Sequence, residues 1–125
     1  MNIPAELKYT KEHEWVKVDG SVVVVGITDY AQGELGDIVF VELPSVGTEV
    51  KAMEPFGTIE AVKAVSDLFS PISGKIAEAN PVLEDDPMVI NRDPYGEGWM
   101  IKVEIGDPAE LDGLLDSEAY EKLIG

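Results

Sequence analysis

The chain has 125 residues, enough for one domain with a hydrophobic core, and 45% of them are hydrophobic. Its formal net charge of −16 argues against nucleic acid and anionic membranes, because both are bound through Lys and Arg. The absence of cysteine excludes disulfides, a thiolate nucleophile and a Cys-based metal site. The acidity suits partners with basic surfaces, but solubility explains it as well, and on charge alone we prefer solubility.

The N-terminal residues lack the apolar core of a secretory signal and the Arg-rich character of a transit peptide. No stretch approaches the roughly 18 uninterrupted apolar residues that would span a bilayer. We therefore expect a cytoplasmic protein with no membrane segment, or a mitochondrial-matrix protein if a transit peptide has been removed.

The first third of the chain predicts a hairpin followed by a short helix. Asp19-Gly20 separates two runs of apolar residues, and this pair favours a two-residue type I′ turn. Thr28 is a suitable N-cap for a helix over residues 29–35, which Gly36 would end. Further strands are expected over residues 38–43, 56–62, 75–79 and 88–90.

The clearest alternation of the chain lies in residues 99–105 and predicts a half-buried strand. Its apolar face carries Trp99, Ile101, Val103 and Ile105. After it, Asp107 followed by Pro108 and Glu110 predicts the start of a helix, and Ser117 is expected to cap a second helical turn. The C-terminal tail is therefore expected to be helical.

Many short strands, with helices only near the start and the end, predict one mostly β domain over residues 1–125. We expect a sandwich or barrel of antiparallel strands with peripheral helices. A faint internal echo supports this, because Gly57-x-Ile59 recurs as Gly74-x-Ile76. The two copies lie on either side of Ser66-Asp67, as expected if two similar β-arms flank a hairpin tip there.

No catalytic constellation is evident in the sequence. His13 is the single histidine, and its neighbour Glu14 would point to the opposite face of a strand, so we interpret His13 as a surface or edge residue. Asp85-Asp86 is interpreted as a solvated turn, and no spacing of His or acidic residues predicts a metal site. The residues alone thus indicate no active site.

Lys63 stands among small side chains in an acidic part of the chain. A catalytic amine needs a lowered pKa, but the nearest charges in sequence are Glu60 and Asp67, which would raise it. An exposed lysine between Ala61 and Ala64 would suit modification by an ATP-dependent enzyme. The residues alone leave open whether Lys63 is modified or is an ordinary surface lysine.

The surroundings of Lys63 resemble a known family. Residues 60–67 and 70–74 resemble the lipoyl-attachment segment of the glycine cleavage H proteins. Other motifs of that family are matched by residues 8–15, 26–32, 35–44, 91 and 93–99. The resemblance extends from about Leu7 to about Tyr120, nearly the whole chain, and implies a lipoyl-domain-like sandwich of two antiparallel sheets (a barrel-sandwich hybrid) with the lysine at a hairpin turn.

The resemblance implies a non-enzymatic, monomeric carrier with lipoate joined to Lys63 through an amide bond, as N6-lipoyl-lysine. The dithiolane would accept methylamine at the pyridoxal-phosphate-dependent glycine decarboxylase (P protein), as carbon dioxide leaves. It would deliver one carbon to tetrahydrofolate on the aminomethyltransferase (T protein), and a dihydrolipoyl dehydrogenase (L protein) would reoxidise it. A lipoate ligase, or an octanoyl or lipoyl transferase, would attach the group. The cofactor carries the chemistry and the protein positions it.

By the same resemblance, Glu14 and Asp67 are candidates for a cleft that shelters the loaded arm. The candidate context for recognition by the attaching enzyme is Glu60, Ala61, Val62, Ala64 and Gly74. Two residues depart from the family pattern: Ala61 stands where a serine is usual, and Glu34 stands where some members carry a histidine.

Two other hypotheses stay open. The chain could be a lipoyl carrier for another pathway, which relays lipoate to 2-oxo acid dehydrogenases or serves sulfur metabolism. It could also be an unmodified β-sandwich that only binds other proteins. A biotin carrier is less favoured, because such carriers flank the lysine with methionine, where this chain has Val62 and Ala64.

Overall fold

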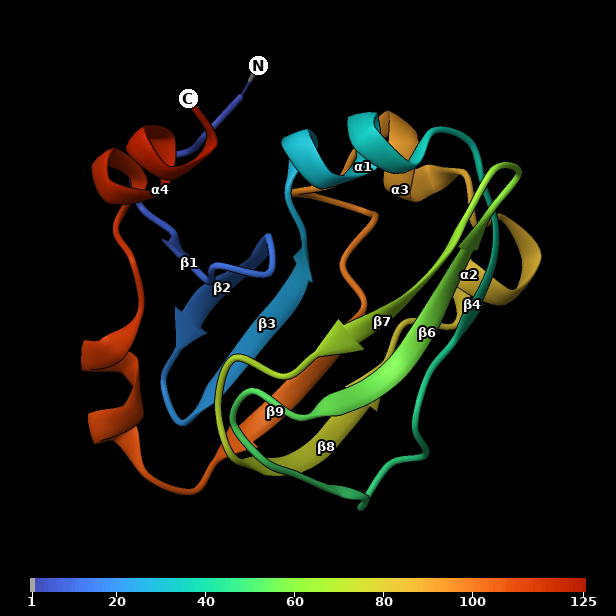
Figure 1. The fold of residues 1–125 in the computed structure, drawn as a ribbon. Helices are drawn as coiled ribbons and strands as arrows, with labels where there is room; N and C mark the ends of the chain where they lie inside the picture. The colour runs from blue at the N-terminus through green and yellow to red at the C-terminus, as the bar shows by residue number, and fades with distance from the viewer. Residues whose placement is uncertain (1) are drawn as a thin grey trace.

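The computed structural model describes residues 2–125 and contains two antiparallel sheets packed face to face (Figure 1). The larger sheet has six strands in the order β1 (Lys8–Tyr9), β2 (Glu14–Asp19), β3 (Val22–Ile27), β9 (Ile101–Ile105), β8 (Gly74–Ala79) and β5 (Glu49–Val50). The smaller sheet has the order β4 (Ile38–Glu42), β6 (Pro55–Ala61) and β7 (Val65–Phe69). The predicted fold class is confirmed, with two open sheets rather than a closed barrel.

Five helical segments accompany the sheets: α1 (Asp29–Leu35), α2 (Val82–Asp85), α3 (Val89–Arg92), the 3₁₀ helix η1 (Pro108–Gly113) and α4 (Ser117–Ile124). The predicted first hairpin is confirmed, with Gly20 at a φ of 65° in the turn between β2 and β3. The predicted α1 is also confirmed, because the Thr28 side chain accepts a hydrogen bond from the Ala31 amide and Gly36 ends the helix.

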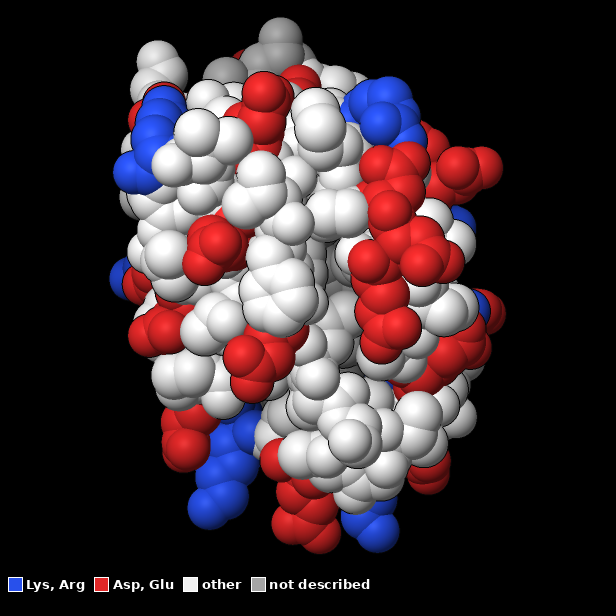
Figure 2. Space-filling view, turned by 90° about the vertical axis from the view of Figure 1, so that its right-hand side faces the viewer, with Lys and Arg blue, Asp and Glu red and all other residues white. Residues whose placement is uncertain are grey.

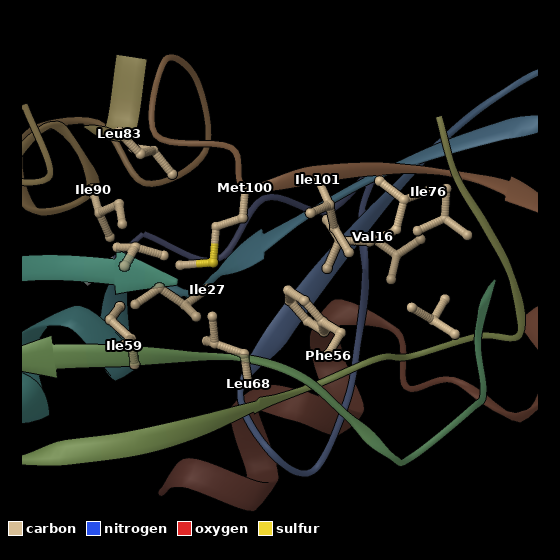
Figure 3. Packing of buried hydrophobic residues seen from close by; sticks show 14 of the residues in the cluster. Val16, Ile27, Phe56, Ile59, Leu68, Ile76, Leu83, Ile90, Met100 and Ile101 are labelled. Atoms are coloured by element: carbon tan, nitrogen blue, oxygen red, sulfur yellow. The ribbon is translucent and has the colours of Figure 1, made fainter. Parts of the chain in front are cut away.

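The main core lies between the sheets (Figure 3). Ile59 and Leu68 of the smaller sheet share this core with Val16 and Ile101 of the larger one, and all four are at most 2% exposed. Each such side chain contributes about 1.5–3 kcal/mol by its burial. A second cluster on the outer face of the larger sheet packs Tyr9 and Trp15 against Tyr120 of α4, which fixes the C-terminal helix on β1.

The middle of the chain differs from the prediction. The strand expected at residues 88–90 is wrong, because Val89 and Ile90 begin the helix α3 and are both buried. A run of three apolar residues does not distinguish a buried strand from a buried helix turn. Together with α2, this helix covers one end of the sandwich, so the expectation that helices occur only near the chain ends is also wrong.

The hairpin tip lies at Lys63, as the family resemblance implied, and not at Ser66-Asp67, where the internal echo predicted it. Ser66 and Asp67 belong to the strand β7, and the turn is formed by residues 62–64 with Lys63 at its centre. The two arms of the internal echo therefore belong to different sheets, with Gly57 in β6 and Gly74 in β8.

Two boundaries also shift. The alternating strand begins at Ile101, and Trp99 packs on the outer cluster while Met100 is fully buried in the main core. The cap of α4 is Asp116 instead of Ser117, because the Asp116 carboxylate accepts the Ala119 amide hydrogen bond at 2.8 Å.

Candidate functional site

The hairpin between β6 and β7 presents Lys63 to solvent on a fixed tip. The Ala61 amide donates to the Ala64 carbonyl at 2.7 Å, which closes the turn. The Val62 amide donates to the Asp37 carbonyl at 3.1 Å, which ties the turn to the segment before β4. Lys63 itself is exposed. Two backbone hydrogen bonds therefore hold the backbone of the turn from which the Lys63 side chain extends.

The segment behind the tip is held by an asparagine that the sequence analysis did not single out as a site residue. The Asn91 side chain donates to the Gly36 carbonyl at 2.9 Å and accepts from the Ile38 amide at 2.9 Å. Gly36 has a φ of 79°, and a Cβ there would lie 3.5 Å from Cε of Lys63. The lysine stem therefore passes beside Gly36, at the end of α1.

The candidate residues for recognition by the attaching enzyme differ in their exposure and in their distance from the tip. Glu60, Val62 and Ala64 are exposed around the tip. Ala61 is only 4% exposed and pairs with the buried Ile38, so a serine hydroxyl would lie in the core at this position. Gly74 begins β8, at the far end of the hairpin from Lys63.

Gly74 has a structural reason to be glycine. A Cβ on it would collide with the backbone carbonyl of Glu104 in the neighbouring strand β9 and would lie 2.8 Å from Cγ1 of Val103. Its pairing with β9 therefore depends on the missing side chain. A wide hollow of about 630 Å³ lies at this end of the molecule, beside β5 and η1.

A smaller cavity of about 290 Å³ lies between α1, β7 and the turn before β2. Its walls are formed by Glu12, His13, Ile27, Tyr30, Ala31, Glu34, Leu35, Ser66 and Asp67. The structure thus places Asp67 and Glu34 in one cavity and adds Glu12 as a third carboxylate. Asp67 is four residues from Lys63, about 13 Å along an extended strand. A cavity with three carboxylates suits a small cationic group.

Glu14 lies behind this cavity and is not among its walls. It is 2% exposed and accepts a hydrogen bond from the Thr10 hydroxyl at 2.6 Å. Burial raises the pKa of its carboxyl to about 8, although hydrogen bonds from Thr10 and from the Phe69 backbone oppose the shift. The Glu14 side chain is therefore mostly protonated at neutral pH, in contrast to an exposed carboxylate.

His13 is half-buried and lines the cavity, which corrects its interpretation as a simple surface or edge residue. Its ring lies 4.9 Å from the Tyr30 ring, and its Nδ1 lies 2.9 Å from the Tyr120 hydroxyl. Burial lowers the pKa of the imidazole, against the opposing charges of Glu12 and Glu34. No local sequence pattern links His13 to Tyr120, because they are 107 residues apart.

The hydrogen bonds around Tyr120 determine which His13 nitrogen carries the proton. The fully buried Thr28 hydroxyl lies 2.7 Å from the Tyr120 hydroxyl and accepts the Ala31 amide. Within residues 2–125, Tyr120 is thus the acceptor available to the Thr28 O–H, which would otherwise be buried without a partner. Tyr120 then donates to Nδ1 of His13, so the neutral ring carries its proton on Nε2.

Within residues 2–125, the acidic and histidine side chains form no group of three that could hold a metal ion. No helix in the same range is long and apolar enough to cross a membrane.

The chain is similar to known proteins over nearly its whole length. The family model described as glycine cleavage H-protein matches residues 7–125. A glycine cleavage system H protein of Chlorobium limicola is 61% identical, with 100% of this chain and 99% of the relative covered. Another from Symbiobacterium thermophilum is 60% identical, with 96% of this chain and 94% of the relative covered.

The fold agrees as well. The crystal structure of a glycine cleavage system H protein from Mycobacterium marinum superposes with a TM-score of 0.87. It is 42% identical in sequence, and the match covers 98% of this chain and 99% of that one. The family model, the full-length relatives and the shared fold lead to one conclusion: the chain belongs to the glycine cleavage H-protein family.

Proposed function

We propose that this protein is the lipoyl carrier of the glycine cleavage system and that lipoate is attached to Lys63. The observation that carries the proposal is the exposed Lys63 on a hairpin tip held by two backbone hydrogen bonds, with a carboxylate-lined cavity beside one arm of the hairpin. Membership of the H-protein family supports the carrier role.

Attachment uses the lysine amine as a nucleophile. Nζ of Lys63 attacks the carbonyl of an activated acyl group, which is an adenylate or a thioester. The new amide bond forms as the bond to AMP or to the carrier thiol breaks, and the amine loses its protons to a base and to water. The modified side chain has no positive charge, so the protein becomes one unit more negative.

When bound, the lipoyl group supplies a disulfide that accepts methylamine and a dithiol that is later reoxidised. The side chains of the cavity supply recognition. Asp67 and Glu34 accept hydrogen bonds from a cationic amine, and their charges favour its protonated form. A protonated nitrogen has no free lone pair to expel the sulfur to which its carbon is bonded. The cavity thus protects the loaded group from loss to water.

The protein works with the enzymes of the same system: glycine decarboxylase, aminomethyltransferase and dihydrolipoyl dehydrogenase, together with the enzyme that attaches lipoate. The bacterial relatives support a cytoplasmic setting. Membership of the H-protein family supports a carrier without an activity of its own.

The Lys63→Arg variant tests the proposal. Arginine keeps the charge and much of the length at an exposed position, so the variant is expected to fold, but its guanidinium cannot be acylated. Intact mass is expected to show a lipoyl adduct on the wild-type chain and none on the variant. In an assay reconstituted with the three partner enzymes, only the wild-type chain is expected to support glycine cleavage. Activity of the Lys63→Arg variant, or an unmodified wild-type lysine, would contradict the proposal.

A further inference from the structure

A β-bulge turns Phe40 out of the core, close to the hairpin that carries Lys63. The register between β4 and β6 shifts between Ile38 and Phe40. Regular alternation from the buried Ile38 would have placed Phe40 inward. Instead Val41 is buried and Phe40 is 54% exposed. Bulges are frequent beside functional sites, where they redirect a side chain, and here the redirected side chain is an aromatic ring.

Phe40 belongs to a row of side chains that runs across the smaller sheet. It lies opposite Glu60 of β6, and Glu60 lies opposite Val65 of β7. Residues directly opposite each other project from the same face of a sheet. Val65 is 66% exposed, and Val62 at the tip is 76% exposed. We call these four residues, Phe40, Glu60, Val62 and Val65, the docking face.

The surroundings of the docking face are acidic. The next row on the same face of the sheet, two residues farther from the hairpin tip along each strand, contains Glu42, Thr58 and Asp67. The strands β4, β6 and β7 contain no Lys or Arg. On the side of the molecule that carries β4 and α2, uncharged side chains run down the middle and acidic ones gather on both flanks (Figure 2). The complementary partner surface is an apolar hollow bordered by cationic side chains.

The reach of an unmodified lysine identifies the partner. Its amine is carried on a four-carbon stem and must arrive at the acyl carbonyl inside the active site of the attaching enzyme. That enzyme therefore has to close around the hairpin tip and touch the side chains beside it. The enzymes that act later meet a much longer lipoyl arm, which lets them bind the carrier farther from the tip.

We propose that the docking face binds the ATP-dependent enzyme that acylates Lys63, with Phe40 as the main apolar contact. This inference rests on the proposed function. Glu60 contributes charge at the centre of the row, and the two valines extend the apolar contact to the tip. The bulge in β4 thus supplies an aromatic contact from a strand that lies outside the lysine-bearing segment.

The test measures kcat/KM for attachment of lipoate to Lys63 by a lipoate ligase with lipoate and ATP. Phe40→Ser is expected to lower it about tenfold, as for a central aromatic contact. Val65→Thr is expected to lower it severalfold. Val46→Thr is the matched control, because Val46 is also 66% exposed but lies outside the docking face. Unchanged thermal unfolding of each variant would establish that the fold is intact.

Three outcomes overturn the inference or its basis, and they are distinguishable. If the wild-type chain is not acylated on Lys63, the proposed function itself fails. If the wild-type chain is acylated and Phe40→Ser behaves like it, only the docking face fails. If Phe40→Ser is acylated normally but works poorly with glycine decarboxylase or aminomethyltransferase, the face serves those enzymes and the inference is wrong.

Discussion

The buried Glu14 makes the stability of the protein depend on pH in a predictable direction. Replacement of Glu14 by Gln keeps the size of the side chain and removes its ability to ionise. The Thr10 hydroxyl still finds a carbonyl oxygen as acceptor in the glutamine. The variant therefore isolates the cost of charging a carboxyl that is 2% exposed.

The sign and the size follow from the two pKa values. The carboxyl ionises at its ordinary 4.5 in the unfolded chain and at about 8 in the folded one. Between these values the folded state holds a proton that the unfolded state has released, so stability falls as pH rises through this window. At about 1.4 kcal/mol per pH unit, the loss is on the order of 5 kcal/mol and is complete slightly above pH 8.

The assay is urea unfolding of both proteins at several pH values from about 5 to 9. The wild-type free energy of unfolding is expected to fall relative to that of Glu14→Gln as pH rises, so that the variant is the more stable protein at pH 9. Val46→Thr is the control, because it changes an exposed side chain without adding or removing an ionisable group and should give a nearly constant difference. Parallel curves for wild type and Glu14→Gln would refute the buried, protonated carboxyl.

Two further predictions concern packing and hydrogen bonding. Gly74→Ala is expected to lower the free energy of unfolding in urea by about 3 kcal/mol, because its Cβ meets the β9 backbone. Gly33→Ala is the control: the space around Gly33 in α1 is open, so this variant should be more stable by up to about 1 kcal/mol. Equal stabilities of the two variants would contradict the crowding at Gly74. Tyr120→Phe is expected to raise the pKa of His13 in an NMR titration, because the lost hydroxyl donates a hydrogen bond to the neutral imidazole. An unchanged or lower pKa of His13 would show that the proton of the neutral ring lies on Nδ1.

Elements with local chemical signals were predictable from the sequence. Asp19-Gly20 supports a turn with positive φ, and Thr28 supplies the oxygen that caps α1, whatever the rest of the chain does. Strand β7 lacked such a signal, because three of its five residues are exposed and it shows no regular alternation. The helix α3 was missed because burial of both Val89 and Ile90 is imposed by packing on the sandwich, not by the local sequence.

The site was predictable in part. The resemblance to the family singled out Lys63, Glu14 and Asp67, and the structure places Asp67 among the walls of the cavity and Glu14 outside them. The role of His13 could not be predicted, because its partner Tyr120 reaches it only after α4 packs on β1. The exposure of Phe40 could not be predicted either, since the continuous apolar run of β4 contains no mark of the bulge.

The fixed hairpin tip has a consequence for the speed of delivery. With lipoate on Lys63, as proposed, the backbone hydrogen bonds of Ala61 and Val62 would hold the anchor, so that the motion of a loaded group would be confined to its own flexible tether. Once an enzyme has bound the carrier, the group searches only the small volume that the tether sweeps. Short flexible tethers give effective concentrations in the millimolar range. Each transfer then behaves as an intramolecular event, and its rate no longer depends on the concentration of free cargo in the cell.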